Sequence, residues 1–272
     1  GALTQGEPDS KGVTKGAAQD TLMAQYNDLA SVERLLEAND GAVAAVIVEP
    51  VAANMGVVPP EDGFLQGLRT LCDRHGALLI FDEVITGFRL AAGGAQEYFG
   101  VQADLVTYGK IIGGGMPVGA YAGSRALMEQ VAPTGPVYQA GTLSGNPVAM
   151  AAGLAQLNII TDHPEIYTVM ETSASYIANH LRASAEKHGI AMQVNQIGSL
   201  LCPYFTETPV NCYAAAKKSD TKRYAAYFNG MLKRGIYLAP SQFEAMFVSS
   251  VHTQNDLACT VQAAEETLSE MA

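Results

Sequence analysis

The sequence predicts an α/β fold, in which a mostly parallel sheet flanked by helices is followed by a smaller α+β domain. Between residues 42 and 157, short continuous apolar runs alternate with segments of helical periodicity. Continuous apolar strands are typical of a sheet that is buried on both faces. After Pro164 the pattern changes to a long helix and mixed short strands. We therefore expect a large domain at residues 1–163 and a small C-terminal domain at residues 164–272.

The first domain is expected to begin with a mobile loop over residues 1–16, which are rich in Gly, Ser, Thr and Lys. A helix over residues 28–38 follows, with Asp28 as its N-cap. Four short apolar segments are predicted strands: Ala45–Val48, 77–81, 105–107 and 120–122.

Two further helices fill the connections of this domain. One lies around residues 64–72 and should stop near Gly76. The other is expected over residues 147–160, because Pro147 suits the first turn of a helix and follows Asn146. In the small domain, helices are predicted at residues 166–187 and near residues 255–271.

Composition excludes several classes of function. The formal charge of −11, with no Lys/Arg-rich run, argues against a nucleic-acid partner. The four cysteines have neither CxxC spacing nor a close histidine, so no metal site is predicted and a reducing cytosol is expected. No apolar stretch approaches the roughly 20 residues of a membrane span, so no membrane partner is expected either.

Lys110 is the most informative candidate for chemistry. It follows an apolar run and precedes three consecutive glycines, Gly113, Gly114 and Gly115. A lysine amine that is kept neutral can act as a nucleophile toward a carbonyl group. Taken alone, the same pattern also fits a solvated lysine beside a turn.

Polar residues at neighbouring strand ends strengthen the case for Lys110. Asp82 ends the second predicted strand, and in open α/β sheets ligands bind beyond the carboxyl ends of the strands. A buried aspartate needs a cationic partner, which could be Arg89, another nearby arginine or a protonated ring nitrogen. An Asp and a Lys in this arrangement match the two protein groups that pyridoxal phosphate requires.

Other residues could complete such a cofactor site. Val84 could pack on a ring face or belong to the core, and Asn54 could contact a phenolic oxygen or only stabilise a turn. The segment 141–147 offers backbone N–H groups and hydroxyls for a phosphate, although Ser144 or Asn146 could instead cap a helix.

Taken together, these motifs resemble those of the class III, fold type I aminotransferases. The matching segments are residues 48–56, 79–89, 93–96, 109–119 and 136–147. The resemblance implies the pyridoxal-phosphate-dependent transferase fold type I and a bound pyridoxal or pyridoxamine 5'-phosphate. It also implies roles for four residues: Lys110 as the Schiff-base lysine and proton carrier, Asp82 as partner of the pyridinium nitrogen, Val84 on the ring, and Asn54 at the phenolic oxygen.

Within this family the chain is most similar to the aminomutase branch, since Ile85 stands where other branches typically have glutamine. This similarity implies an isomerase that converts an amino-aldehyde, glutamate 1-semialdehyde, into the porphyrin precursor 5-aminolevulinate. It implies a homodimer in which Gly141 and Thr142 bind the cofactor phosphate across the subunit boundary. The expected location is the bacterial cytoplasm or the plastid stroma.

The match also includes Glu244, which the resemblance places at the substrate as a third catalytic residue. Met246 stands where the family usually has glycine. The family's upstream phosphate cup and substrate-carboxylate arginine have no counterpart, so we expect a C-terminal fragment cut within a lid loop. Two alternatives remain open: another class III ω-aminotransferase, or an inactive fragment that needs the N-terminal segment as a complementing chain.

Overall fold

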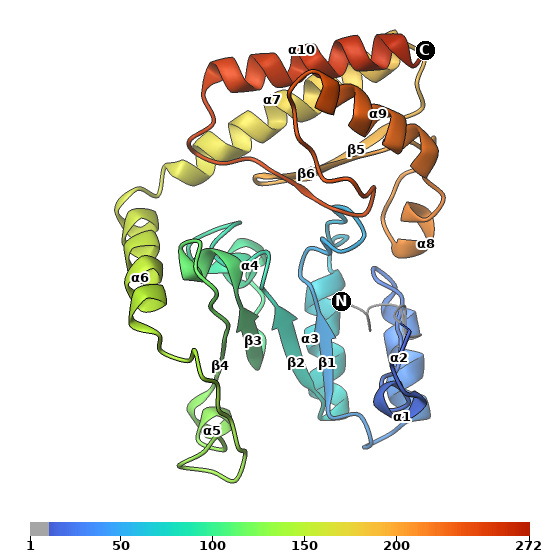
Figure 1. The fold of residues 1–272 in the computed structure, drawn as a ribbon. Helices are drawn as coiled ribbons and strands as arrows, with labels where there is room; N and C mark the ends of the chain where they lie inside the picture. The colour runs from blue at the N-terminus through green and yellow to red at the C-terminus, as the bar shows by residue number, and fades with distance from the viewer. Residues whose placement is uncertain (1–10) are drawn as a thin grey trace.

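The computed structural model describes residues 11–272, and the first ten residues of the expected mobile loop lie outside the described residues. Within the described part, the end of that predicted loop already enters a short helix, α1 (Lys15–Ala18). Two sheets organise the chain, with one unit above the other in the view of Figure 1.

The first sheet has the strand order β1-β2-β3-β4. Its strands are β1 (Ala45–Val48), β2 (Leu78–Asp82), β3 (Leu105–Tyr108) and β4 (Ala120–Gly123). The first three are parallel and β4 is antiparallel to β3, which confirms the predicted mostly parallel sheet. The register places Asp82 opposite Thr107, so the end of β2 lies beside the end of β3.

Helices α2 (Leu29–Ala38) and α3 (Phe64–His75) cover one face of this sheet. Asp28 caps α2 as expected, because its side chain accepts a hydrogen bond from the backbone N–H of Ser31 at 3.0 Å. Gly76 ends α3 in the left-handed conformation, where glycine carries no steric penalty. Leu79 and Phe81 of β2 are fully buried in this layer.

The expectation that both faces of the sheet are buried is wrong for this chain. Successive side chains of a strand point to opposite faces, and α2 and α3 both pack on the face that carries Leu79 and Phe81. On the other face, Ile47 is 63% exposed. All four residues of β4 are exposed as well.

Four short or peripheral elements complete the first unit: α4 (Gly94–Phe99), the 3-10 helix η1 (Lys110–Gly113), α5 (Arg125–Met128) and α6 (Pro147–Asp162). Asn146 caps α6, since its side-chain oxygen accepts hydrogen bonds from the backbone N–H groups of Val148 and Ala149. In Figure 1, α6 runs along the side of the sheet and leads up into the second unit.

The second unit packs helices on an antiparallel sheet of order β5-β6-β7. Its strands are β5 (Gln193–Ile197), β6 (Leu200–Tyr204) and β7 (Met246–Phe247). Its helices are α7 (Ile166–Lys187), α8 (Tyr213–Ala216), α9 (Thr221–Lys233) and α10 (Gln254–Glu270). The chain passes from α6 to α7 at residues 163–165, and the division into domains 1–163 and 164–272 stays a prediction. Within residues 11–272, no helix is both long and apolar enough to cross a membrane.

Candidate active site

Asp82 lies at the carboxyl end of β2, where one of its carboxylate oxygens is held by two donors. Oδ1 accepts a hydrogen bond from the backbone N–H of Val84 at 3.1 Å and from the hydroxyl of Thr107 at 3.4 Å. Among the described residues, none donates a hydrogen bond to the second oxygen, Oδ2. The aspartate is therefore oriented by its neighbours and keeps one acceptor for a ligand.

Arg89 is not the partner of Asp82. Its guanidinium donates to the hydroxyl of Ser199 at 3.3 Å and lies over the ring of Phe247, 4.8 Å from the ring centroid. Of the partners that the sequence left open for Asp82, the ion pair with Arg89 is excluded.

Lys110 follows β3 and is the first residue of η1. Its side chain is exposed, and within residues 11–272 its amine forms neither a hydrogen bond nor an ion pair. Its φ of +47° is uncommon for a residue with a side chain. Thr107, whose hydroxyl reaches Asp82, precedes Lys110 by three residues, so the two predicted catalytic groups come from adjacent strand ends.

The glycines after Lys110 allow η1 to lie directly on α6. A Cβ atom at Gly114 would overlap the carbonyl oxygen of Ala152, and one at Gly153 would overlap the carbonyl oxygen of Ile112. Our sequence reasoning missed Gly153. A single buried glycine inside a helical pattern is the signal that could have revealed it.

Val84 lies beside the turn that carries Lys110. A Cβ atom at Gly109 would come within 3.2 Å of a Val84 methyl carbon. The structure thus brings Val84 next to Lys110, as expected for residues that share one ligand, while its packing on a cofactor ring stays a prediction.

Asn54 is held at the same edge of the sheet by Glu49. Its amide donates to Glu49 Oε1 at 2.8 Å, and the backbone N–H of Ala53 donates to Oε2 at 3.0 Å. Burial raises the pKa of Glu49 above its ordinary value, and the nearby charge of Asp82 raises it further. Glu49 therefore binds Asn54 directly and lies close enough to Asp82 for the two carboxyl groups to interact electrostatically.

Glu83, next to Asp82, is a fully buried carboxylate that the sequence did not single out. It accepts hydrogen bonds from the hydroxyl of Thr86 at 3.0 Å and from the backbone N–H groups of Ala95 at 2.5 Å and Gln96 at 3.4 Å. Burial raises its pKa. Glu83 satisfies the first N–H groups of α4 and so anchors that helix to the end of β2.

Glu244 is exposed and lies in the loop just before β7. This loop is attached to the first unit, because the backbone N–H of Gly56 donates to the carbonyl of Phe243 at 2.8 Å. The segment that carries Asn54 therefore lies beside the loop that carries Glu244. Met246, the departure from the family pattern, pairs with Leu201 in β7, where a methionine fits without a special backbone conformation.

Gly141 and Thr142 lie in an exposed loop ahead of α6. The carbonyl of Gly141 accepts a hydrogen bond from the backbone N–H of Ser144 at 3.0 Å. Within the part of the chain that the structure describes, no hydrogen bond joins Thr142 to Lys110 or Asp82. The capping role left open for Asn146 is confirmed, while phosphate binding by Thr142 stays a prediction.

The described residues contain no cluster of three or more His, Cys, Asp or Glu side chains that could hold a metal ion. An oriented aspartate with one free oxygen, an unpaired lysine, an asparagine and a small apolar side chain follow strands that end at the same edge of the sheet.

The sequence profile described as aminotransferase class-III matches residues 4–262. The chain belongs to this family. Its relatives include a protein of Ruminiclostridium cellulolyticum named glutamate-1-semialdehyde 2,1-aminomutase, which is 63% identical over 270 residues. The match covers 99% of this chain and 62% of the relative.

Two solved structures share the fold. An ω-transaminase from Sphaerobacter thermophilus is 31% identical, with a TM-score of 0.87 over 96% of this chain and 60% of that chain. A glutamate-1-semialdehyde aminomutase from Pseudomonas aeruginosa PAO1 in complex with PMP is 26% identical, with a TM-score of 0.85 and the same coverage. The predicted fold type is thereby confirmed, and the chain spans about 62% of the length of the curated relative named above.

Proposed function

We propose that the protein containing this chain is a pyridoxal-phosphate-dependent aminomutase that converts glutamate 1-semialdehyde into 5-aminolevulinate by moving an amino group within the substrate. The observation that carries the proposal is the placement of Asp82 and Lys110 at adjacent strand ends, where Oδ2 of Asp82 and the amine of Lys110 bind no described residue. The name of the 63% identical relative supports this substrate among those of the family. The product would enter porphyrin synthesis.

The residues present fit pyridoxal or pyridoxamine 5'-phosphate. Asp82 Oδ2 would accept a hydrogen bond from the protonated ring nitrogen, while Oδ1 stays fixed by Val84 and Thr107. Val84 would pack against the ring, and Asn54 would contact the phenolic oxygen. When bound, the cofactor supplies an electron-accepting ring that stabilises negative charge on a carbon next to the transferred nitrogen.

The chain's own residues would perform the proton transfers. Lys110 would take a proton from a substrate carbon at its amine nitrogen and return it elsewhere, which requires a neutral amine within hydrogen-bond reach. Asp82 would keep the ring nitrogen protonated throughout. Glu244 would contact the substrate from the loop beside Asn54.

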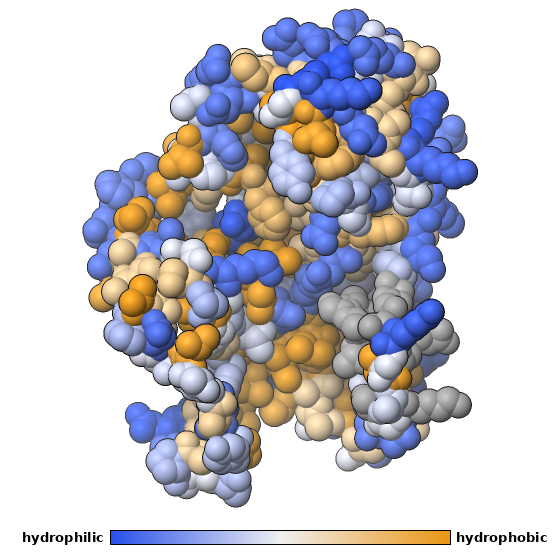
Figure 2. Space-filling view, in the orientation of Figure 1, coloured by the Kyte–Doolittle hydropathy of each residue, from blue (hydrophilic) through white to orange (hydrophobic). Residues whose placement is uncertain are grey.

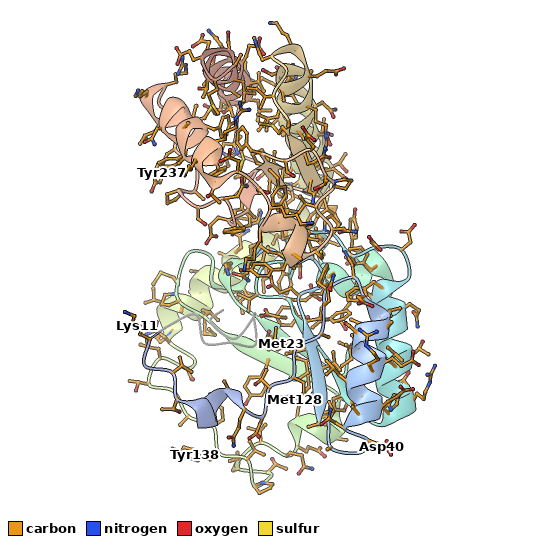
Figure 3. The ribbon with its side chains drawn as sticks, turned by 90° about the vertical axis from the view of Figure 1, so that its right-hand side faces the viewer. Lys11, Met23, Asp40, Met128, Tyr138 and Tyr237 are labelled. Carbon is orange, nitrogen blue, oxygen red and sulfur yellow. The ribbon has the colours of Figure 1, made fainter. Side chains whose placement is uncertain are left out.

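Two partners follow from this proposal. The exposed loop with Gly141 and Thr142 would bind the cofactor phosphate of a second subunit, which makes the protein a homodimer. Figure 3 shows Tyr138, which precedes this loop, at the periphery of the first unit, and it is 85% exposed. The upstream segment of the relatives would complete the site, either in the same polypeptide or as a separate chain. The bacterial source of the relative favours the bacterial cytoplasm over the plastid stroma.

The first rival is an ω-aminotransferase with a separate acceptor, which the structural likeness to the Sphaerobacter enzyme favours. The decisive assay incubates the purified full-length protein with glutamate 1-semialdehyde and no keto acid. We expect 5-aminolevulinate to form. Activity only after a keto acid is added would establish the rival instead.

The second rival is an inactive fragment that needs a complementing chain. This rival is tested by borohydride reduction in the presence of the cofactor, followed by peptide mapping. The labelling of this chain alone is compared with that of the full-length protein. We expect Lys110 to carry the label in the full-length protein, and the Lys110→Ala variant to carry none and to lose at least about 100-fold of the activity. A label on another lysine would overturn the assignment of Lys110.

A further inference from the structure

The turn formed by residues 83–90, here called the 83–90 turn, leaves the site at Asp82 and contacts both units of the molecule. Its backbone is closed by hydrogen bonds from Gly87 N–H to the carbonyl of Glu83 at 2.9 Å and from Arg89 N–H to the carbonyl of Thr86 at 3.0 Å. It is therefore a compact element and not an open loop.

One side of the 83–90 turn packs on the end of β3. The rings of Phe88 and Tyr108 lie with their centroids 5.5 Å apart, and a Cβ atom at Gly87 would come within 2.7 Å of the Tyr108 ring. Phe88 has a φ of +59°, an uncommon conformation for a bulky residue. Tyr108 precedes Lys110 by two residues, so the turn contacts the segment that positions the lysine.

The other side of the 83–90 turn is attached to the second unit. The hydroxyl of Tyr167, in α7, donates to the carbonyl of Phe88 at 3.0 Å. Arg89 donates to the hydroxyl of Ser199 at 3.3 Å and covers the ring of Phe247. Phe247 follows Glu244 by three residues in the chain.

Arg89 therefore contacts the strand that continues the Glu244 loop. Gly56 holds this loop on one side of Glu244 through Phe243, and Arg89 holds it on the other side through Phe247. Burial lowers the pKa of Arg89, and among the described residues no carboxylate compensates its charge. A half-buried guanidinium over an aromatic face makes a directional contact, since the cation must stay above the ring.

We propose that Arg89 is a positioning residue, which fixes the loop carrying Glu244 relative to Asp82 and Lys110. The inference rests on the proposed function and adds a residue to it. Arg89 would act through Phe247 without touching the substrate. Its loss should therefore remove the contribution of Glu244 and leave the attachment of the cofactor at Lys110 intact.

The test is a double-mutant cycle on the full-length protein with Arg89→Met, Glu244→Gln and the double variant. We expect Arg89→Met to lower kcat/KM for the semialdehyde by about 10- to 100-fold, because displacement of a catalytic group by about 1 Å has effects of that size. The double variant should be no slower than the slower single variant, since coupled residues are not additive. The absorbance band of the bound cofactor and the borohydride label on Lys110 should not change.

Two further variants keep the test decisive. Phe247→Leu removes the aromatic face and should reproduce the effect even if Arg89→Met fails to fold. Arg89→Lys retains a cation and should recover part of the activity. Arg182→Met is the control, because Arg182 is an exposed arginine of the second unit that donates to Asn179 and to the carbonyl of Val194.

The outcomes separate this inference from the proposed function. If the wild-type protein forms no 5-aminolevulinate without an acceptor, both are overturned. If the wild type is active but the losses of Arg89→Met and Glu244→Gln multiply, or Arg89→Met has full activity, only the role of Arg89 is overturned. Loss of the Lys110 label in Arg89→Met would also overturn it, because the effect would then be structural.

Discussion

Lys110 is positioned by its neighbours and not by a partner of its own amine. Its left-handed backbone costs of the order of 1 kcal/mol, which the packing around it must offset. Gly109 is buried ahead of it against Val84, and Gly114 and Gly115 behind it adopt positive φ angles that glycine tolerates. The strain lies in the backbone. The side-chain amine binds no described residue and is available for a ligand.

Glu83 shows how the neighbour of a candidate catalytic residue can be structural. Replacement of Glu83 by Ala would leave the first N–H groups of α4 buried without an acceptor. We expect the free energy of unfolding to fall by about 1–3 kcal/mol, measured by urea denaturation. An unchanged midpoint would show that water replaces the carboxylate.

The raised pKa of Glu83 gives a second expectation at this position. Because its folded-state pKa lies above its ordinary value of 4.5, the folded protein binds more protons than the unfolded one, and this group's contribution to stability falls as pH rises above 4.5. Glu83→Gln cannot ionise. The difference in unfolding free energy between wild type and Glu83→Gln should therefore shift in favour of the variant between about pH 4.5 and pH 7, and a constant difference would contradict the expectation.

Single residues were predictable from sequence where the cause is local. Asp28 was expected as a cap and Asn146 was one of two candidate caps, and each accepts hydrogen bonds from N–H groups within three residues. The contact of Arg89 with Ser199 could not be predicted, because Ser199 lies 110 residues away and no local pattern indicates it. The acceptor role of Glu83 toward Ala95 was missed for the same reason.

At the scale of elements, the contact between η1 and α6 determines where Lys110 stands. Gly153→Ala would place a methyl group on the carbonyl of Ile112, so that η1 or α6 must move. We expect a loss of about 1–3 kcal/mol in stability from overpacking together with a fall in kcat, measured by thermal unfolding and steady-state assay of the full-length protein.

Gly67→Ala in α3 is the matched control for Gly153→Ala. Its added methyl group would meet only the flexible side chain of Leu29, far along the chain from Lys110. Both variants gain about 1 kcal/mol of helix propensity, but only Gly153→Ala should change kcat. Equal kinetic effects would show that the glycine contact does not position the lysine.

The packing of α10 on α7 should depend on pH through Glu265. Hydrogen bonds from Lys187, Ser184 and His188 lower the pKa of Glu265 from 4.5 to about 2. The contribution of this carboxylate to stability is therefore present above pH 4.5 and is lost as pH falls toward about 2. Since the pair with Lys187 is partly exposed, we expect Glu265→Gln to lower the unfolding free energy at neutral pH by only about 0.2–1 kcal/mol.

The measurement for Glu265 is urea denaturation of wild type and Glu265→Gln across the acid range. The difference in unfolding free energy between wild type and Glu265→Gln should vanish toward the lowest pH values. Glu186→Gln, on the same helix α7, is the control and should show no such dependence. A difference between wild type and Glu265→Gln that persists below about pH 2 would contradict the assignment.

The bounds of helices and strands were more predictable than the burial of their faces. The strands at Ala45–Val48 and the helix Ile166–Lys187 have the expected bounds, because their apolar periods are set by residues within the element. The exposure of Ile47 could not be predicted from the same period, since a continuous apolar strand does not reveal which face has a covering layer.

For the molecule as a whole, the site depends on contacts between the two units. The hydroxyl of Tyr204 donates to the carbonyl of Met55 at 2.9 Å, and Gly56 leaves no room there for a side chain. Asn195 donates to the carbonyl of Val57 at 2.9 Å. These bonds hold the segment after Asn54 against β5 and β6, so the second unit positions Asn54 as well as Glu244.

We propose that the surface along α6 forms part of the subunit interface of the homodimer. Figure 2 shows apolar side chains reaching the surface on the α6 side of the molecule. The exposed apolar residues of α6 are Val148, Met150, Leu154 and Ile159. If Thr142 serves a partner's phosphate, the helix that starts just after it must lie near the same boundary.

The variant Leu154→Glu tests this boundary, because Leu154 is 62% exposed and contributes little to the fold of the subunit. A charge buried at an interface without a partner is strongly unfavourable, so the full-length variant should sediment as a monomer and retain less cofactor at equal concentration. Val169→Glu places the same charge on α7, at a similarly exposed position of the second unit, and should leave both properties unchanged. If Leu154→Glu remains a dimer with full cofactor, the subunit boundary lies elsewhere, and Thr142 must then reach the phosphate of its own chain or none.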